Sequence, residues 1–498
     1  MKHSSKTILK NIGALMGSQA ITWMLMLLLT IFLPRYLGAE AIGQLHLGMS
    51  IWMIMGVFMA FGMDTFLIKA IARDPAQAPD LLGTTLVVRA VLFILSFGIV
   101  TLYAYMAQYP TETLYIIYLV GIAQLLWQWV AACEAVLEGL ETMEHISIAR
   151  VVGKIINTFL GIAVLLLGYG IYTIGIVGII AALGNLLLLF IILGRRYRLR
   201  LRIAPRQAVT MVKASASYLT IALSLVFYNQ VDVIIISFLV NEQTIGWYSA
   251  SDRLFSTLLF VPTIIVTAIF PMLARTNTDD PTAMPRIMRR NFDMMLLVSV
   301  PLGLGLMIIA DPLVVLLFGA EFAASGPILA VMGIVLIFTY LNILLGKFML
   351  ATDRQNIWTV VMVTATVLTV PLDLVLIPWC QQMFANGAIG GALSYVVTEA
   401  SMVLAGLWLL PGGALNWSNV RTAALIILAG IAMAGATWWF RDAFLAIPIL
   451  VGAVTYIGLI LLLRVIPRED RALLKQLTRQ MLQRVRRRNR ATASVGGV

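Results

Sequence analysis

Long apolar stretches alternate with short polar ones along the whole chain, and this pattern predicts membrane-spanning helices. A stretch of about 20 apolar residues is long enough to cross ~30 Å of hydrocarbon as a helix. The sequence therefore predicts an all-α polytopic membrane protein with about 14 transmembrane helices. Their expected windows are 13–34, 43–63, 83–107, 113–136, 149–169, 172–193, 214–238, 246–273, 293–317, 326–349, 356–378, 388–410, 421–440 and 444–465.

Composition and charge placement agree with this pattern and add an orientation. Of the 498 residues 61% are hydrophobic and 12% are charged, whereas a soluble domain is about 25% charged. With the N-terminus inside, all Lys and Arg residues except Arg35, Arg253 and Arg441 fall on the inner side. The positive-inside rule then predicts an N-in/C-in, multi-pass protein of the inner (cytoplasmic) membrane. The net charge of +12 reflects this topology, so no nucleic-acid partner is expected.

An internal repeat divides the chain into two units of six helices. The segment "LGAEAIGQL" at 37–45 aligns with "VNEQTIGWY" at 240–248, and "GIVGIIAAL" at 175–183 aligns with "GAIGGALSY" at 387–395. Parallel repeats of this kind occur in transporters with a site between two lobes. The expected domains are an N-terminal lobe 1–194, a basic cytoplasmic linker 195–213, a C-terminal lobe 214–410, two added spans 411–466 and a basic amphipathic cytoplasmic tail 467–498.

The chain offers no pattern typical of catalysis. It has three histidines and two cysteines, without metal-ligand spacing, and it contains no nucleotide-binding or nucleophile motif. We therefore expect no enzyme activity, no catalytic residues, no metal site and no cofactor.

Charged residues inside the predicted spans are the informative chemistry, because each costs several kcal/mol unless it faces water or a partner. Most lie in the two repeat units, which favours a polar cavity between the lobes. Arg253 has two interpretations: a headgroup position at the start of its span, or a cavity position if the span begins at the shared Ile-Gly. The charges considered are Arg89, Asp232, Asp252, Arg253, Lys347, Asp373 and Glu399.

A second charged group follows spans four and five. Glu134, Glu138, Glu141 and His145 are spaced to share one helix face, and Arg150 and Lys154 share a face of the next span. Two interpretations remain open: an ion-paired knot that fixes the inner ends of these spans, or an inner gate whose pairs break when the cavity opens.

The start "LKNIGALMGSQAITWMLMLLLTIFLPRYLGAEAIGQL", the segment "FYNQVDVIIISFLVNEQTIGWYSASDRL" and the layout of two six-helix units plus two helices resemble the bacterial oligosaccharide flippases. These form the polysaccharide transport branch of the multidrug/oligosaccharidyl-lipid/polysaccharide exporter superfamily. The resemblance implies alternating-access transport of an undecaprenyl-pyrophosphate-linked oligosaccharide in surface polysaccharide biosynthesis. It implies as partners that substrate, membrane lipids and polysaccharide assembly proteins, and we expect a monomer.

The family's cationic cavity maps onto Arg253, Arg89, Lys154 and Lys347 as expected substrate contacts. The acids Asp232, Asp373 and Glu399 depart from that pattern, and three roles are open to them: pairing with arginines, binding sugar hydroxyls, or carrying a proton or sodium ion. The alternative function is a cation-coupled multidrug or small-solute antiporter of the same superfamily. Cationic drugs favour acids in the cavity, whereas a pyrophosphate favours bases.

Overall fold

The computed structural model describes residues 5–196, 202–410 and 412–465, and all regular structure within them is helical. The α-helices are α1 (Ser5–Ala60), α2 (Met63–Arg73), α3 (Ala78–Met106), α4 (Thr111–Gly139), α5 (Met143–Leu166), α6 (Ile171–Arg196), α7 (Pro205–Leu239), α8 (Glu242–Leu258), α9 (Phe260–Asp279), α10 (Met284–Phe318), α11 (Ser325–Ala351), α12 (Gln355–Phe384), α13 (Ala388–Leu409), α14 (Trp417–Trp439) and α15 (Ala446–Leu462). Three short 3-10 helices occupy Pro75–Gln77, Pro281–Ala283 and Ala320–Phe322.

The prediction of an all-α membrane protein is confirmed. In the described part of the chain, 11 helices are long and apolar enough to cross a membrane, and two shorter apolar helices accompany them at Gln230–Leu239 and Ala446–Leu462. One of the 11 is a stretch of 52 residues, Thr22–Arg73, which contains the first two predicted windows. The two windows share one helical stretch because the chain reverses without a loop.

Glycine makes this reversal possible. Within α1, Gly38 has φ 80° and ψ 172°, a backbone conformation that residues with a Cβ rarely adopt. The helix of the second window ends at Ala60, where Phe61 (φ 47°) and Gly62 (φ 72°) separate α1 from α2. The eighth window is not one helix: α8 ends at Leu258 and α9 begins at Phe260, two residues before Pro262.

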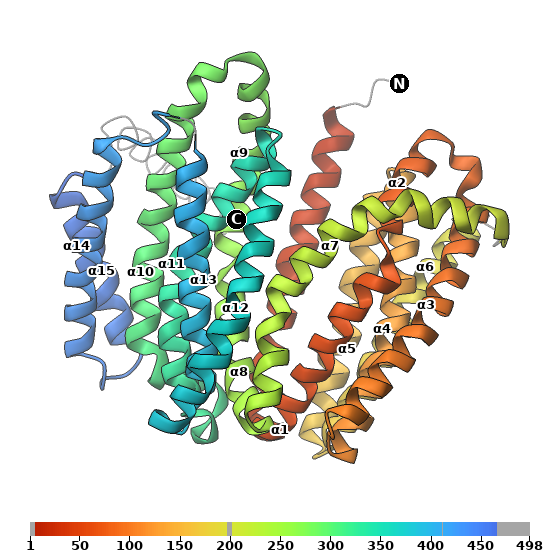
Figure 1. Ribbon diagram of the computed structural model, residues 1–498, viewed down its shortest axis with the longest axis horizontal. Coiled ribbons are helices and arrows are strands. Elements are labelled where there is room, and N and C mark those ends of the chain that lie inside the picture. Colours follow the sequence, from red (N-terminus) through yellow and green to blue (C-terminus); the bar gives the residue numbers. More distant parts are fainter. Residues whose placement is uncertain (1–4, 197–201, 411, 466–498) are drawn as a thin grey trace, which may run out of the picture.

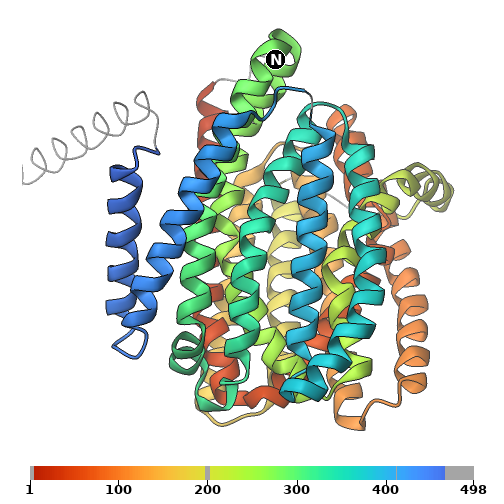
Figure 2. The same cartoon turned by 60° about the vertical axis from the view of Figure 1, so that its left-hand side comes forward.

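Two groups of helices stand side by side (Figure 1). We call α1–α6 the first lobe and α7–α13 the second lobe. Their ribbons approach at the end where α1 and α8 are labelled, and they diverge toward the end that holds the N-terminus. Helices α14 and α15 pack on α10 at the edge of the second lobe (Figure 2).

The buried apolar residues follow this division. One large core cluster belongs to α7–α15, and two smaller clusters belong mainly to the first lobe. A further cluster joins the lobes at the end where their ribbons approach. It includes Leu29, Ile42 and Ile116 from the first lobe and Ala250, Leu254 and Phe318 from the second.

One expected boundary differs in the structure. The linker expected at 195–213 is shorter, because α6 continues to Arg196 and α7 begins at Pro205; proline suits the first turn of a helix, where its missing N–H has no intrahelical partner. The tail expected at 467–498 lies outside the described residues.

Candidate functional site

Arg253 lies inside α8 and not at its start. The helix begins at Glu242, where the Asn241 side chain accepts a hydrogen bond from the Thr244 backbone N–H (3.0 Å) and caps the first turn. Arg253 is therefore about 16 Å along the helix from its first residue. Its side chain is half-buried, and in the described part of the chain its guanidinium has no hydrogen bond or ion pair.

Two further nitrogen-bearing side chains approach Arg253 from the first lobe. The positive charge of Arg253 acts on His46 in α1 and on Lys154 in α5. The negative charge of Asp252 acts on Arg253. Among the described residues, the His46 Nε2 atom is buried without a hydrogen-bond partner, and Lys154 has no ion pair. Two side chains of the first lobe, an imidazole and an ammonium, thus lie within electrostatic range of the Arg253 guanidinium, an arrangement that suits an anion. We call His46, Lys154 and Arg253 the basic cluster.

Arg89, which the sequence suggested as a substrate contact, lies outside this cluster. Its side chain is fully buried in the first lobe, where it forms an ion pair with Asp64 (2.6 Å) and donates a hydrogen bond to the Gln128 carbonyl. The Gln128 side chain in turn donates to the Gly56 carbonyl (2.9 Å). These bonds connect the end of α1 and the start of α2 to α3 and α4. Arg89 therefore stabilises the turn between α1 and α2.

We expect Asp64→Ala to lower the free energy of unfolding by about 3 kcal/mol, because it leaves the buried Arg89 guanidinium without its counter-ion. Arg89→Met should cost less, since the Asp64 carboxylate that remains is partly hydrated. Thermal unfolding in detergent measures both. Asp442→Ala is the control because that side chain is 93% exposed. Equal losses for Asp64→Ala and Asp442→Ala would contradict the structural role of the pair.

The acidic group expected on one face of span four is divided by the structure. Helix α4 ends at Gly139, and Glu141 has a left-handed backbone (φ 59°) in the turn before α5. Only Glu134 and Glu138 therefore share the α4 face. Arg150 binds Glu134 through two hydrogen bonds of 2.9 and 2.7 Å. This pair joins α4 to α5 within the first lobe and does not bridge the two lobes.

Lys347, another expected substrate contact, lies near the inner end of α11 by the predicted topology. It is exposed, and its Nζ atom is 5.8 Å from the centre of the Phe270 ring. A cation held over an aromatic face is weakly stabilised at an exposed position. The structure does not bring Lys347 into the basic cluster.

The acids of the second lobe form a separate buried group. Asp373 in α12 is fully buried, and neither of its carboxylate oxygens has a hydrogen-bond partner among the described residues. Asp232 in α7 is 9% exposed, and the charges of Asp373 and Asp252 act on it. Two carboxyl groups that share a dry environment favour a bound cation or proton. In the described residues no group of three His, Cys, Asp or Glu side chains is placed to hold a metal ion.

Glu399, the third acid, has a partner. The Asn342 side chain in α11 donates a hydrogen bond of 2.6 Å to its carboxylate in α13. The hydroxyl of the preceding residue, Thr398, is 3.1 Å from the Thr369 hydroxyl and links α13 to α12. Both hydroxyls also donate to backbone carbonyls of their own helices, so they are already engaged although Thr369 lies one turn from Asp373 on α12.

An apolar groove lies along another face of α8. It has a volume of about 710 Å³, and its lining comes from α8, α9, α10, α14 and α15. Leu254, the residue after Arg253, is part of its wall, and the Tyr456 hydroxyl is already occupied because it donates to the Leu297 carbonyl (2.9 Å). A groove with so few free polar groups suits a hydrocarbon chain.

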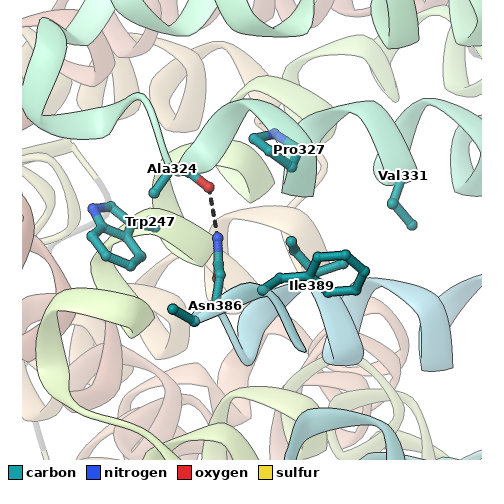
Figure 3. Close-up of a pocket in the computed structure, with 8 residues that line it drawn as sticks. Trp247, Ala324, Pro327, Val331, Asn386 and Ile389 are labelled. Carbon is teal, nitrogen blue, oxygen red and sulfur yellow. Dashed lines mark hydrogen bonds between the residues drawn. The ribbon is translucent and has the colours of Figure 1, made fainter. Parts of the chain in front are cut away.

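A second pocket, of about 490 Å³, lies at the end where the lobes meet. Figure 3 shows Trp247, Pro327 and Ile389 on its walls, and the Asn386 side chain donating a hydrogen bond of 2.8 Å to the Ala324 carbonyl. This pocket belongs to the second lobe and is separate from the basic cluster.

Sequence reasoning missed His46 and Asp64. It also missed Glu242 and Glu321, whose carboxylates accept hydrogen bonds from Gln44 and from the Ala39 backbone N–H of the first lobe. For His46 a signal was present, because it is a polar residue inside an apolar window and lies three residues after Gly43, which the repeat shares with Gly246. No such signal exists for the pairing of Asp64 with Arg89, which are distant in sequence.

Comparisons with known proteins identify the family and the fold of the chain. The family model described as "Polysaccharide biosynthesis protein" matches residues 32–327. The probable low-salt glycan biosynthesis flippase Agl15 of Haloferax volcanii is 20% identical over 172 residues, which are 34% of this chain. The aligned region spans 36% of that relative.

Two solved structures show the same fold. The lipid II flippase MurJ in an inward closed conformation superposes with a TM-score of 0.69 at 15% identity, over 89% of this chain and 96% of MurJ. An inward-facing multidrug resistance transporter of the MATE family, in the MOP superfamily, gives a TM-score of 0.62 at 13% identity, over 81% of this chain and 95% of that one.

Proposed function

The chain belongs to the polysaccharide biosynthesis protein family, and on that premise we propose that it moves an undecaprenyl-pyrophosphate-linked oligosaccharide across the cytoplasmic membrane. It is a multi-pass membrane transporter of the flippase type and not an enzyme. The observation that carries the proposal is the basic cluster. Arg253 and Lys154 are half-buried cations that form no contact ion pair in the described part of the chain, although the charge of Asp252 acts on Arg253, and a diphosphate is the anion that such a site fits.

The lobes provide the movement in this proposal. The first lobe (1–194) and the second lobe (214–410) rock about their shared end, and the added helices (411–466) stay on the second lobe. The chain crosses the membrane fourteen times, with both termini inside. We infer that the lobes separate at the end that holds the N-terminus, where their ribbons diverge (Figure 1). The basic cluster is then reached from the cytoplasm, where a lipid-linked oligosaccharide is assembled.

The apolar groove beside Leu254 supports a lipid-linked substrate over a free sugar. In this proposal the lipid tail of the substrate occupies the groove lined by α8, α9, α10, α14 and α15. The hydrocarbon tail then stays in an apolar environment while the head group crosses the protein.

The buried acids of the second lobe supply the driving force in this proposal. We assign Asp232 and Asp373 to a cation, a proton or a sodium ion, that binds in the second lobe and couples its gradient to transport. Asp373 supports this assignment because both of its carboxylate oxygens are free of hydrogen bonds among the described residues.

The same acids favour the second candidate, a cation-coupled multidrug or small-solute antiporter. The two candidates differ in the substrate that the cavity attracts: an antiporter for cationic drugs would place acids where this chain has Arg253, Lys154 and His46. The acids Asp232 and Asp373 lie instead inside the second lobe, which agrees better with coupling than with drug recognition.

Reconstitution into proteoliposomes tests the proposal. A fluorescent polyprenyl-pyrophosphate oligosaccharide should cross the bilayer in the presence of the protein and an inward cation gradient, and cationic dyes should not be exported. Empty liposomes and liposomes with the Arg253→Ala protein are the controls. Export of cationic dyes without movement of any lipid-linked sugar would replace the flippase by the antiporter.

A further inference from the structure

The two copies of the Ile-Gly motif meet each other in space. Helix α1 packs on α8, and Gly43 lies against the second copy so closely that a Cβ there would be 1.9 Å from the Glu242 carbonyl oxygen. Gly246 lies against the first copy in the same way, with a Cβ position 1.8 Å from the Ala39 carbonyl oxygen. Ala39 and Glu242 are themselves equivalent in the repeat. The contact is therefore reciprocal, as a pseudo-twofold relation between the lobes requires.

Only glycine permits this contact. An ordinary carbon–oxygen contact is about 3.3 Å or longer, so a methyl group at either glycine forces the two backbones apart by more than about 1 Å. Backbone atoms lie on both sides of the contact, and no side chain can turn aside to make room.

Two carboxylates hold the lobes together around the glycines. Glu242 of the second lobe accepts hydrogen bonds from Gln44 (2.6 Å) and Thr113 of the first lobe. Glu321 of the second lobe accepts a hydrogen bond of 2.7 Å from the Ala39 backbone N–H, which follows the Gly38 bend. Charge-assisted hydrogen bonds are among the stronger polar contacts, and each of these connects one lobe to the other.

This contact continues into the basic cluster along single helix faces. On α8, Glu242, Gly246, Ser249 and Arg253 follow one another at the spacing of a helix face, and on α1 the equivalent positions include Ala39, Gly43 and His46. Ser249, between the contact and Arg253, is fully buried, and among the described residues its hydroxyl has no hydrogen-bond partner. The contact between the two Ile-Gly motifs therefore closes the basic cluster on the side of Gly43 and Gly246.

We propose that Gly43 and Gly246, with Glu242 and Glu321, form a latch that closes the outer exit of the transport path while the cavity faces the cytoplasm. The latch residues are positioning residues: the glycines let the lobes meet backbone to backbone, and the carboxylates release their partners when the lobes separate to let the head group leave. The proposal rests on alternating access in the proposed function. It adds which residues keep the exit closed and why the Ile-Gly motif occurs twice.

The test measures the opening of the exit without using the substrate. Both cysteines, Cys133 and Cys380, are free and are replaced by alanine, and Ser249→Cys then provides a single thiol beneath the latch. A membrane-impermeant maleimide is added to the outside of right-side-out membrane vesicles. We expect Gly43→Ala to raise the labelling rate about tenfold, because it destabilises the closed state and shifts the population toward the open one.

Gly48→Ala is the matched control. Gly48 lies on the same helix, but a Cβ there would be 3.6 Å from its nearest neighbours, an ordinary contact. Its labelling rate should equal that of the parent protein. Equal labelling of Gly43→Ala and Gly48→Ala, in proteins that insert and resist heating alike, would overturn the latch.

A second pair of variants keeps the test valid if Gly43→Ala does not fold. Glu321→Gln keeps the shape of the side chain and removes its charge, so labelling of the Ser249→Cys thiol should rise several-fold. Glu40→Gln is its control, since Glu40 is exposed on the neighbouring turn. Failure to move lipid-linked sugars, together with these labelling changes, would refute the proposed function and support the latch. Normal transport, together with unchanged labelling in Glu321→Gln, would support the proposed function and refute the latch.

Discussion

Arg253→Ala is expected to reduce transport of a lipid-linked oligosaccharide at least about 100-fold while the protein still folds and inserts. Removing one charge of a desolvated pair typically costs about 3 kcal/mol of binding, and this is a factor of roughly 100. The guanidinium has no ion pair in the described part of the chain, so its removal breaks no structural contact of that kind. Transport into proteoliposomes and thermal unfolding in detergent separate the two effects.

Two matched variants make this result specific. Arg253→Lys keeps the charge but loses the planar fork that binds paired phosphate oxygens, so it should retain part of the activity. Arg441→Ala removes an arginine of the loop between the added helices, where it lies over the Trp438 ring, and it should transport normally. Full activity of Arg253→Ala would place this arginine outside the substrate path.

Asp373→Asn is expected to abolish cation-driven transport and at the same time to stabilise the protein in sodium-free buffer. The Asp373 carboxylate is fully buried without a hydrogen-bond partner among the described residues. Replacing it by a neutral group of the same size removes a desolvation cost of about 1–3 kcal/mol. Thermal unfolding measures the gain, and uptake with and without a cation gradient measures the loss.

Asp232→Asn is a second test of the same role, and Asp442→Asn is the control. Asp232→Asn should lose the response to the gradient in the same way, because the two carboxyl groups act on one another. Asp442→Asn changes an exposed side chain and should change neither property. Normal gradient-driven transport in both Asp373→Asn and Asp232→Asn would remove these acids from coupling and return them to a structural role.

The helices of this protein were predictable because the sequence carries their cause directly. An apolar run of about 20 residues must form a helix in a bilayer, where no water is present to satisfy the backbone, and the expected windows fall on helices such as α3, α4 and α10. The family was also predictable from the sequence and is confirmed by the match over 32–327. The breaks after Ala60 and Leu258 were not predicted, because local backbone angles decide them and not hydrophobicity.

The candidate site was predictable only in part, for the same reason. The sequence showed that Arg253, Lys154, Arg89 and Lys347 are charged and close to the membrane, and that the Ile-Gly motif occurs twice. The residue types alone could not identify the partner of each charged side chain, because an intramembrane charge can face a cavity or a counter-ion equally well.

The apolar helices, the repeat and the residue types available for binding can be read from the sequence. Packing establishes that Asp64 pairs with Arg89, that the Arg253 charge acts on Lys154 and His46, and that Gly43 lies against Gly246. The difference is one of distance along the chain. Hydrophobic length and helix periodicity are local properties of the chain, whereas ion pairing and backbone contact depend on helices that lie far apart in sequence and are brought together by packing.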